Sequence, residues 1–223
     1  MKLSGGLFMK ILAIDFSSAE RSVAAWNDGV ESQVLETDPL MSDALGMMET
    51  ALREAKLERE DVETVVVGLG PGSYTGIRAS IALAQGWQLA LGVKLLGISS
   101  AQAIAVQAHA SGMRGAVTIV IDAQRGEFYS ASYELSEDQA RETTRLKIVS
   151  TAELRAKDAA GEILIGPEVT RWFPHGKIVS SRAKTLARLA SEGVHEFVSG
   201  EKLEPIYLRE TTFVKAPPAR VIG

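Results

Sequence analysis

The 223-residue sequence predicts an α/β fold made of two lobes, each built on a mixed sheet. Short apolar runs of strand length alternate with longer segments of helical periodicity. The stretch 11–26 reads as a strand ending in an acidic residue, a short turn and a second strand, and the same form returns at 117–135. Asp15 and Asp122 stand at equivalent points of the two stretches. We therefore interpret the chain as an internal duplication.

The first lobe is expected to cover residues 1–104, with 1–8 as an extension ahead of its first strand. Its helices are predicted at 41–57, where apolar residues recur at i, i+3, i+4 and i+7, and at about 76–91 and 100–110. Ser42 and Asp43 can cap the first of these helices. The strands of this lobe are predicted at 10–15, 21–26, 30–36, 63–68 and 93–98.

The second lobe is expected to cover residues 105–223. It begins with the hairpin 117–135 and ends with residues 213–223, which we expect to form a mobile tail. Its further elements are predicted as strands near 145–150, 162–166 and 176–180 and a helix over about 182–192.

Composition excludes several classes of protein. The net charge of -4 shows no strongly basic balance of the kind that marks a nucleic-acid footprint. The absence of cysteine excludes disulfides, thiolate metal sites and cysteine nucleophiles, and it fits the cytoplasm, where we expect the protein. The longest apolar run, 77–93, contains Arg78, Gln85 and Gln88, so we expect no membrane span. The three histidines have no close spacing, so we expect no metal site.

The stretch GLGPGSYTGIR at 68–78 raises the question of a phosphate site. Its glycines permit positive φ and close backbone approach, and a helix start can hold an anion. However, the lysine of a Walker loop is missing, and the spacing is not that of a dinucleotide-binding loop. We therefore favour a tight, capped turn from strand to helix. The candidate residues of a degenerate phosphate site are Asp15, Ser17, Gly70, Gly72, Ser73, Thr75 and Arg78.

Asp15, at the end of the first strand, has two interpretations. It could hold a hydrated metal or orient a water, or it could form an Asx turn with Ser17 or Ser18, which we favour. Asp122 is followed by AQRGE, without a second glycine-rich loop. No nucleophile, base and acid stand at a spacing that suggests catalysis, and we assign no catalytic residue.

The helices 41–57 and 76–91 are candidates for a partner surface. The second is apolar around almost its whole circumference, which predicts burial on both sides. Small residues at four-residue spacing would let another helix approach closely, and methionines suit adaptable contacts. Two alternatives remain open, two core helices or an interface. The candidate interface residues are Met41, Leu45, Met47, Met48, Ala82, Gly86 and Ala90.

Five stretches together resemble the TsaB family, also called YeaZ, over roughly residues 10–210. They are ILAIDFSSAERSVAAW, VVVGLGPGSYTGIR, GISSAQAIA, IDAQRGEFYSASY and PIYLRE. The resemblance implies the fold of sugar kinases, Hsp70 and actin, with ribonuclease H-like lobes and a degenerate nucleotide site. It implies a non-catalytic subunit, without cofactor, that binds and activates TsaD. TsaD forms threonylcarbamoyladenosine next to the anticodon of tRNA, and the ATPase TsaE joins the complex.

The resemblance also implies that the helices matching 41–57 and 76–91 pack on their TsaD counterparts as a four-helix bundle. The chain departs from the family at Met41-Ser42-Asp43, where a His-Ser-Glu-like start is usual, and at Gly46, where bulky residues are frequent. We reject the older idea of a glycoprotease, because TsaD's metal-binding histidine pair is absent. The alternatives are an ATP-dependent kinase or ATPase of the same superfamily and a stand-alone homodimer. Contact with tRNA is left open.

Overall fold

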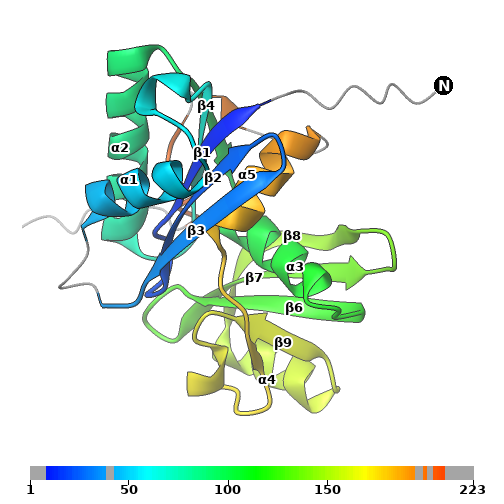
Figure 1. Cartoon of the computed structure of the whole chain (residues 1–223). Coiled ribbons are helices and arrows are strands. Elements are labelled where there is room, and N and C mark those ends of the chain that lie inside the picture. Colours follow the sequence, from blue (N-terminus) through cyan, green and yellow to red (C-terminus); the bar gives the residue numbers. More distant parts are fainter. Residues whose placement is uncertain (1–8, 39–42, 194–197, 200–202, 209–223) are drawn as a thin grey trace, which may run out of the picture.

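The computed structural model describes residues 9–38, 43–193, 198–199 and 203–208. These residues form two lobes, each with one mixed sheet (Figure 1). The strands of the first sheet lie in the order β11-β5-β4-β1-β2-β3. They span β1 (Lys10–Asp15), β2 (Arg21–Asn27), β3 (Val30–Glu36), β4 (Thr64–Gly68), β5 (Lys94–Ile98) and β11 (Val198–Ser199). The helices of this part of the chain are α1 (Ala44–Glu54), the 3-10 helix η1 (Arg59–Asp61), α2 (Tyr74–Leu91) and α3 (Ser100–Ala110).

The second sheet has the order β10-β9-β6-β7-β8. Its strands are β6 (Gly115–Asp122), β7 (Glu127–Leu135), β8 (Ala140–Ser150), β9 (Ile163–Gly166) and β10 (Lys177–Ile178). The remaining helices are α4 (Thr151–Ala159), the 3-10 helix η2 (Val169–Arg171) and α5 (Ala183–Glu192).

The two sheets share one connectivity, which confirms the predicted two-lobed fold and its duplication. β1 pairs antiparallel with β2 and parallel with β4, and β6 pairs in the same way with β7 and β9. The likeness extends to single atoms, because the amides of Ser17 and Gln124 donate to Oδ1 of Asp15 and Asp122, each at 2.8 Å. The copies differ after the first parallel strand, where the first lobe has the 18-residue α2 and the second has only η2.

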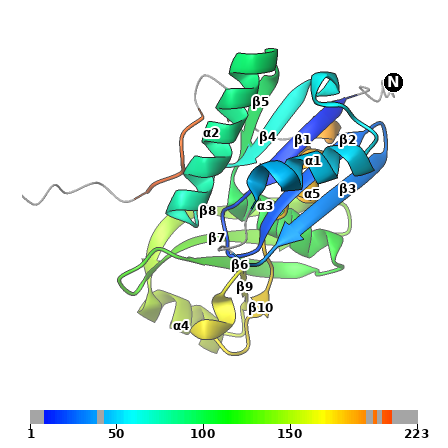
Figure 2. The same cartoon turned by 60° about the vertical axis from the view of Figure 1, so that its left-hand side comes forward.

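Side chains that alternate along β1 divide the first lobe into layers, as the pleat requires. Leu12 and Ile14 pack with α1 and α2, which lie on one face of the sheet (Figure 2). Ile11 and Ala13 face the opposite side and pack with α5. α3 contacts the second sheet and also α5, so it joins the two lobes.

The position of α5 corrects the expectation that the helix over 182–192 continues the second lobe. α5 packs on β1 and β2 of the first sheet, and β11 pairs with β5. Contacts remote in sequence decide this placement: Ala183 N donates to Ser22 Oγ at 2.8 Å, and Arg182 pairs with Glu20. The division of the chain at residue 104 stays a prediction.

The other elements follow the expectations closely. The predicted helix 41–57 begins, within the described residues, at Ala44, where Asp43 is the N-cap and accepts a hydrogen bond from Gly46 N at 3.0 Å. Met41 and Ser42 lie outside the described residues, as do 1–8 and 213–223. α4 was not predicted.

Candidate functional site

The loop between β4 and α2 is bonded to the turn that follows β1. Ser73 is the N-cap of α2, and its side chain accepts a hydrogen bond from Gly76 N at 3.3 Å. The backbone N–H of Ser73 donates to the carbonyl oxygen of Ser17 at 2.7 Å. A donor that would face a phosphate in a working loop is thus used within the chain.

The glycines of this loop are explained by the same contact. A Cβ on Gly72 would lie 2.1 Å from Ser17 O, and a Cβ on Gly76 would lie 2.0 Å from Phe16 O. No side chain fits at such distances. Gly70 and Gly72 also have positive φ, of 86° and 151°. This geometry favours the tight, capped turn over an open phosphate cradle.

Asp15 lies beside this loop with no exposed surface. It accepts hydrogen bonds from Ser17 N at 2.8 Å, from Ser17 Oγ at 2.6 Å and from Ser181 Oγ. A Cβ on Gly68 would lie 2.7 Å from its Oδ2, so the neighbouring strand closes over the carboxyl group. Burial raises the pKa of Asp15, and the hydrogen bonds from Ser17 and Ser181 oppose that rise. Asp15 therefore forms an Asx turn within a packed interior.

The surroundings of Arg78 and Thr75 do not indicate an anion site. The Arg78 guanidinium lies 4.1 Å from the ring centre of Tyr74 and 5.8 Å from that of Tyr207. The two tyrosine rings stack at 5.5 Å. Thr75 is exposed. The charge that could have served a phosphate is instead engaged with aromatic rings.

The segment 203–208, which supplies Tyr207, was not identified from the sequence as part of the site. Leu203 is buried, and Ile206 N donates to Leu69 O at 2.8 Å. The stretch PIYLRE carries part of the family resemblance, but it has no periodicity that would predict a contact with α2.

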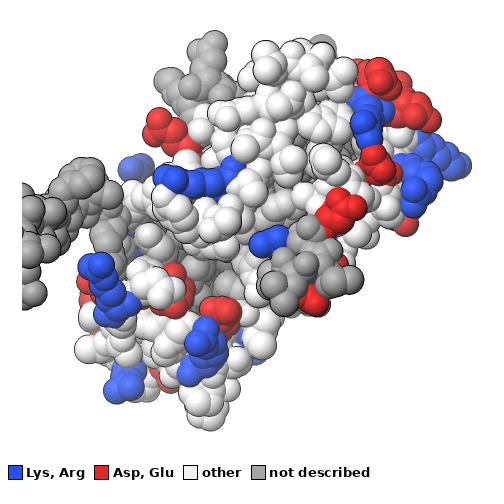
Figure 3. Space-filling view, turned by 90° about the vertical axis from the view of Figure 1, so that its left-hand side faces the viewer, with Lys and Arg blue, Asp and Glu red and all other residues white. Residues whose placement is uncertain are grey.

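The outer face of α2 is open, which corrects the prediction that this helix is buried on both sides. Its buried residues are Gly76, Ile77, Ser80, Ile81 and Ala84. On the other face Leu89 is 90% exposed. Arg78 is the only charged residue in the helix. Figure 3 shows a broad uncharged surface on this side of the first lobe, with charges gathered at its borders.

The predicted interface residues divide into two groups. Ala82, Gly86 and Ala90 are exposed, as is Leu45 on α1, and a Cβ on Gly86 would meet nothing within 4 Å. Met47 and Met48 are only 7% and 1% exposed and pack against the first sheet. The apolar stripe of α1 therefore directs both side chains toward the sheet, which corrects the expectation that these methionines are exposed at the surface. Contact of these residues with a partner stays a prediction.

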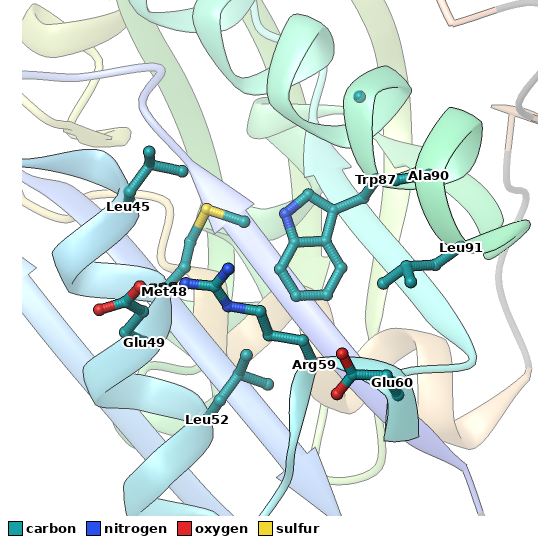
Figure 4. A pocket seen from close by; sticks show the side chains of 10 residues that line it. Leu45, Met48, Glu49, Leu52, Arg59, Glu60, Trp87, Ala90 and Leu91 are labelled. Carbon is teal, nitrogen blue, oxygen red and sulfur yellow. Dashed lines mark hydrogen bonds and ion pairs between the residues drawn. The ribbon is translucent and has the colours of Figure 1, made fainter.

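A cavity of about 250 Å³ lies between α1, η1 and α2. Trp87 extends from α2 into it, Met48 faces it from α1, and Arg59 reaches across to pair with Glu49 (Figure 4). The other residues that line it are Leu45, Leu52, Glu60, Gly86, Ala90 and Leu91. Sequence reasoning missed η1, because a three-residue turn has no periodicity to detect.

Among the described residues, no group of three or more histidine, aspartate or glutamate side chains is placed to hold a metal ion. No helix in this part of the chain is long and apolar enough to cross a membrane.

The two lobes of like connectivity define the class of the protein as a two-lobed α/β protein. A model of the family described as TsaD, tRNA N6-adenosine threonylcarbamoyltransferase, matches residues 41–204. The chain belongs to the TsaB (YeaZ) family, within the group that this model describes.

Several of the individual relatives carry the name TsaB. The tRNA threonylcarbamoyladenosine biosynthesis protein TsaB of Escherichia coli is 29% identical over 95% of this chain and 100% of its own length. TsaB of Bacillus subtilis is 28% identical over 56% of each chain. A Pseudomonas aeruginosa crystal structure, described as an uncharacterized protein with similarity to peptidase YEAZ, matches with a TM-score of 0.76. It is 26% identical and covers 90% of this chain and all of its own.

Proposed function

We propose that this protein is the non-catalytic subunit that binds and activates TsaD in the formation of threonylcarbamoyladenosine next to the anticodon of tRNA. The chain is a tRNA-modification protein of the pathway that its TsaB relatives are named for. In this proposal TsaE joins the complex, the proteins act in the cytoplasm, and the surface of α2 receives TsaD.

The open face of α2 is the observation that carries the proposal. Burial of apolar surface is favourable by about 25 cal/mol per Å². A contiguous exposed apolar patch marks an interaction site, and the buried centre of an interface is depleted in charged residues. The outer face of α2 has Arg78 as its only charge, and it exposes Leu89 (90%) and Leu91 (42%) together with small residues and the uncharged Gln85 and Gln88.

The geometry of the loop and of Asp15 supports a non-catalytic role. Ser73 N is bonded to Ser17 O, and Asp15 is buried among serine donors. An ATP-dependent kinase or ATPase, the alternative function, would need these groups to face a nucleotide. Nothing in their geometry favours that alternative.

The test is reconstitution of tRNA modification with purified TsaD and TsaE, with threonylcarbamoyladenosine measured by mass spectrometry of tRNA nucleosides. We expect product with this protein present and little without it. Equal product without the protein would overturn the activating role. ATP hydrolysis by the protein alone, lost in Asp15→Ala, would favour the kinase or ATPase instead.

Leu89→Asp tests the surface. The side chain is 90% exposed, so the variant should fold, and a charge there should weaken binding to TsaD by about tenfold or more. Ile178→Asp is the matched control, since Ile178 is 63% exposed in the second lobe.

Without TsaD, we expect the same face to pair two copies of the chain. Sedimentation should then show a dimer that Leu89→Asp, but not Ile178→Asp, converts to monomer.

A further inference from the structure

We infer that the cavity between α1, η1 and α2 is a socket for one bulky apolar side chain of the partner, and that Glu60 beside it selects a partner carrying a Lys or Arg next to that side chain. The inference rests on the proposed function, because it takes the α2 face as the surface that receives TsaD. It adds which side chains the partner must present and how they are recognised.

The size of the cavity favours a single side chain. Its volume is about 250 Å³. A protein cavity of about 150 Å³ holds one benzene molecule, whereas pockets for cofactors and drug-sized ligands start at about 300 Å³. The cavity therefore accommodates a residue such as Phe or Leu. Met48, Leu52, Trp87 and Leu91 supply apolar walls for it.

The rim of the socket lets a partner helix come close. Gly86 and Ala90 line it one turn apart on α2, and both are exposed. A Cβ added to Gly86 would meet nothing within 4 Å, so this side of α2 is clear of the rest of the chain. Packed helices lie about 8–10 Å apart, and small residues at the contact allow the shorter distance. At that separation a side chain from the partner reaches the indole of Trp87.

The charges around the socket favour a cation on the partner. Arg59 is paired with Glu49, whereas Glu60 has no ion-pair partner among the described residues. Glu60 and Leu91 both line the cavity, and Leu91 is the last residue of α2, where the negative end of the helix dipole lies. Arg78, in contrast, is near the first turn. These charges are complementary to a partner with its basic residue toward the C-terminal end of α2.

The decisive experiment fills the socket. Gly86→Phe places a ring at the cavity, and we expect it to weaken TsaD binding, measured by calorimetry, by about tenfold or more. Gly86→Ala leaves the volume open and should bind like wild type. In a Trp26→Phe, Trp172→Phe background Trp87 is the only tryptophan. Its emission should shift to the blue when TsaD covers it.

The charge is tested separately. Glu60→Gln should lower the affinity about two- to fivefold at low salt, and the difference should vanish at high salt because exposed pairs are screened. Glu54→Gln removes an exposed carboxylate of α1 that does not line the cavity, so it should have no effect. An unchanged salt dependence in Glu60→Gln would overturn the role of Glu60.

The outcomes separate the socket from the proposed function. If wild type binds TsaD and Gly86→Phe binds equally well, the socket is wrong while the function stands. If wild type does not bind TsaD, the function itself fails. Circular dichroism checks that Gly86→Phe is folded. If it is not, Ala90→Phe, at a second exposed position of the rim, takes its place in the binding test. Loss of self-association with unchanged TsaD binding would assign the socket to a second copy and overturn the proposal.

Discussion

Asp15 has a carboxyl group that reaches no solvent, and its partners come from distant parts of the chain. Ser17 follows it directly, whereas Ser181 belongs to the segment that leads into α5. One buried side chain thus fixes the end of β1 to the start of a helix much later in the sequence. The sequence predicts an Asx turn with Ser17 or Ser18, because that contact is local, and the structure shows Ser17 as the partner. It does not predict Ser181, because nothing near residue 181 marks it as a partner.

Burial should make Asp15 a source of pH-dependent stability. Burial raises the pKa of Asp15 in the folded state above the ordinary 3.8. Between pH 3.8 and the raised pKa, the folded state therefore binds more protons than the unfolded state. The free energy of unfolding should therefore fall as the pH rises through the raised pKa. Asp15→Asn lacks this titration, so the advantage of wild type over the variant should shrink from about pH 4 upward. Urea unfolding at several pH values measures the free energy of unfolding of both proteins. A difference between them that stays constant with pH would contradict the prediction.

At the scale of elements, α2 contains two glycines with opposite surroundings. Gly76 touches the backbone of Phe16, whereas Gly86 faces open space. Gly76→Ala should destabilise the protein by about 1–3 kcal/mol, the usual effect of overpacking. Gly86→Ala should stabilise it by about 0.5–1 kcal/mol, because alanine is the better helix former. Chemical denaturation checks both, and equal effects of the two changes would refute the loop contact described above.

Elements with a strong apolar period are predicted well, and those without one are not. α1 and α2 follow from their sequence patterns, but α4 buries only Leu154 and leaves too weak a pattern to detect. The pattern of α2 also misleads, because an all-round apolar helix predicts cover on both sides and this chain supplies cover on one. The missing cover is itself the signal for a partner. The direction of Met47 and Met48 is set by the register of α1 on the sheet.

At the scale of the whole molecule, the two lobes share structural parts. α5 comes after the second sheet in sequence and completes the core of the first, while α3 contacts both. This arrangement is decided by non-local contacts such as that between Ala183 and Ser22. A reading of local patterns assigns each helix to the nearest sheet along the chain, and for α5 that assignment is wrong.

Shared parts should make the lobes unfold together. In the first lobe, Trp26 packs against the apolar cluster that contains the buried residues of α5. In the second lobe, the ring centres of Trp172 and Phe128 lie 5.1 Å apart. In a Trp87→Phe background, variants that keep only Trp26 or only Trp172 report on one lobe each. We expect the same urea midpoint from both, as two-state unfolding requires. Two separate midpoints would mean that α3 and α5 do not couple the lobes.

The replacement of α2 by the three-residue η2 in the second lobe limits how far the protein can assemble. A duplicated chain with a long exposed helix in each half would carry two equivalent binding surfaces. Each molecule could then bridge two others, and contacts that do not close on themselves grow into filaments. With one such face per chain, the pairing that we propose would use it, and assembly is expected to stop at two molecules. The short η2 thus leaves, among the described residues, no second long helix at the equivalent place from which a filament could grow.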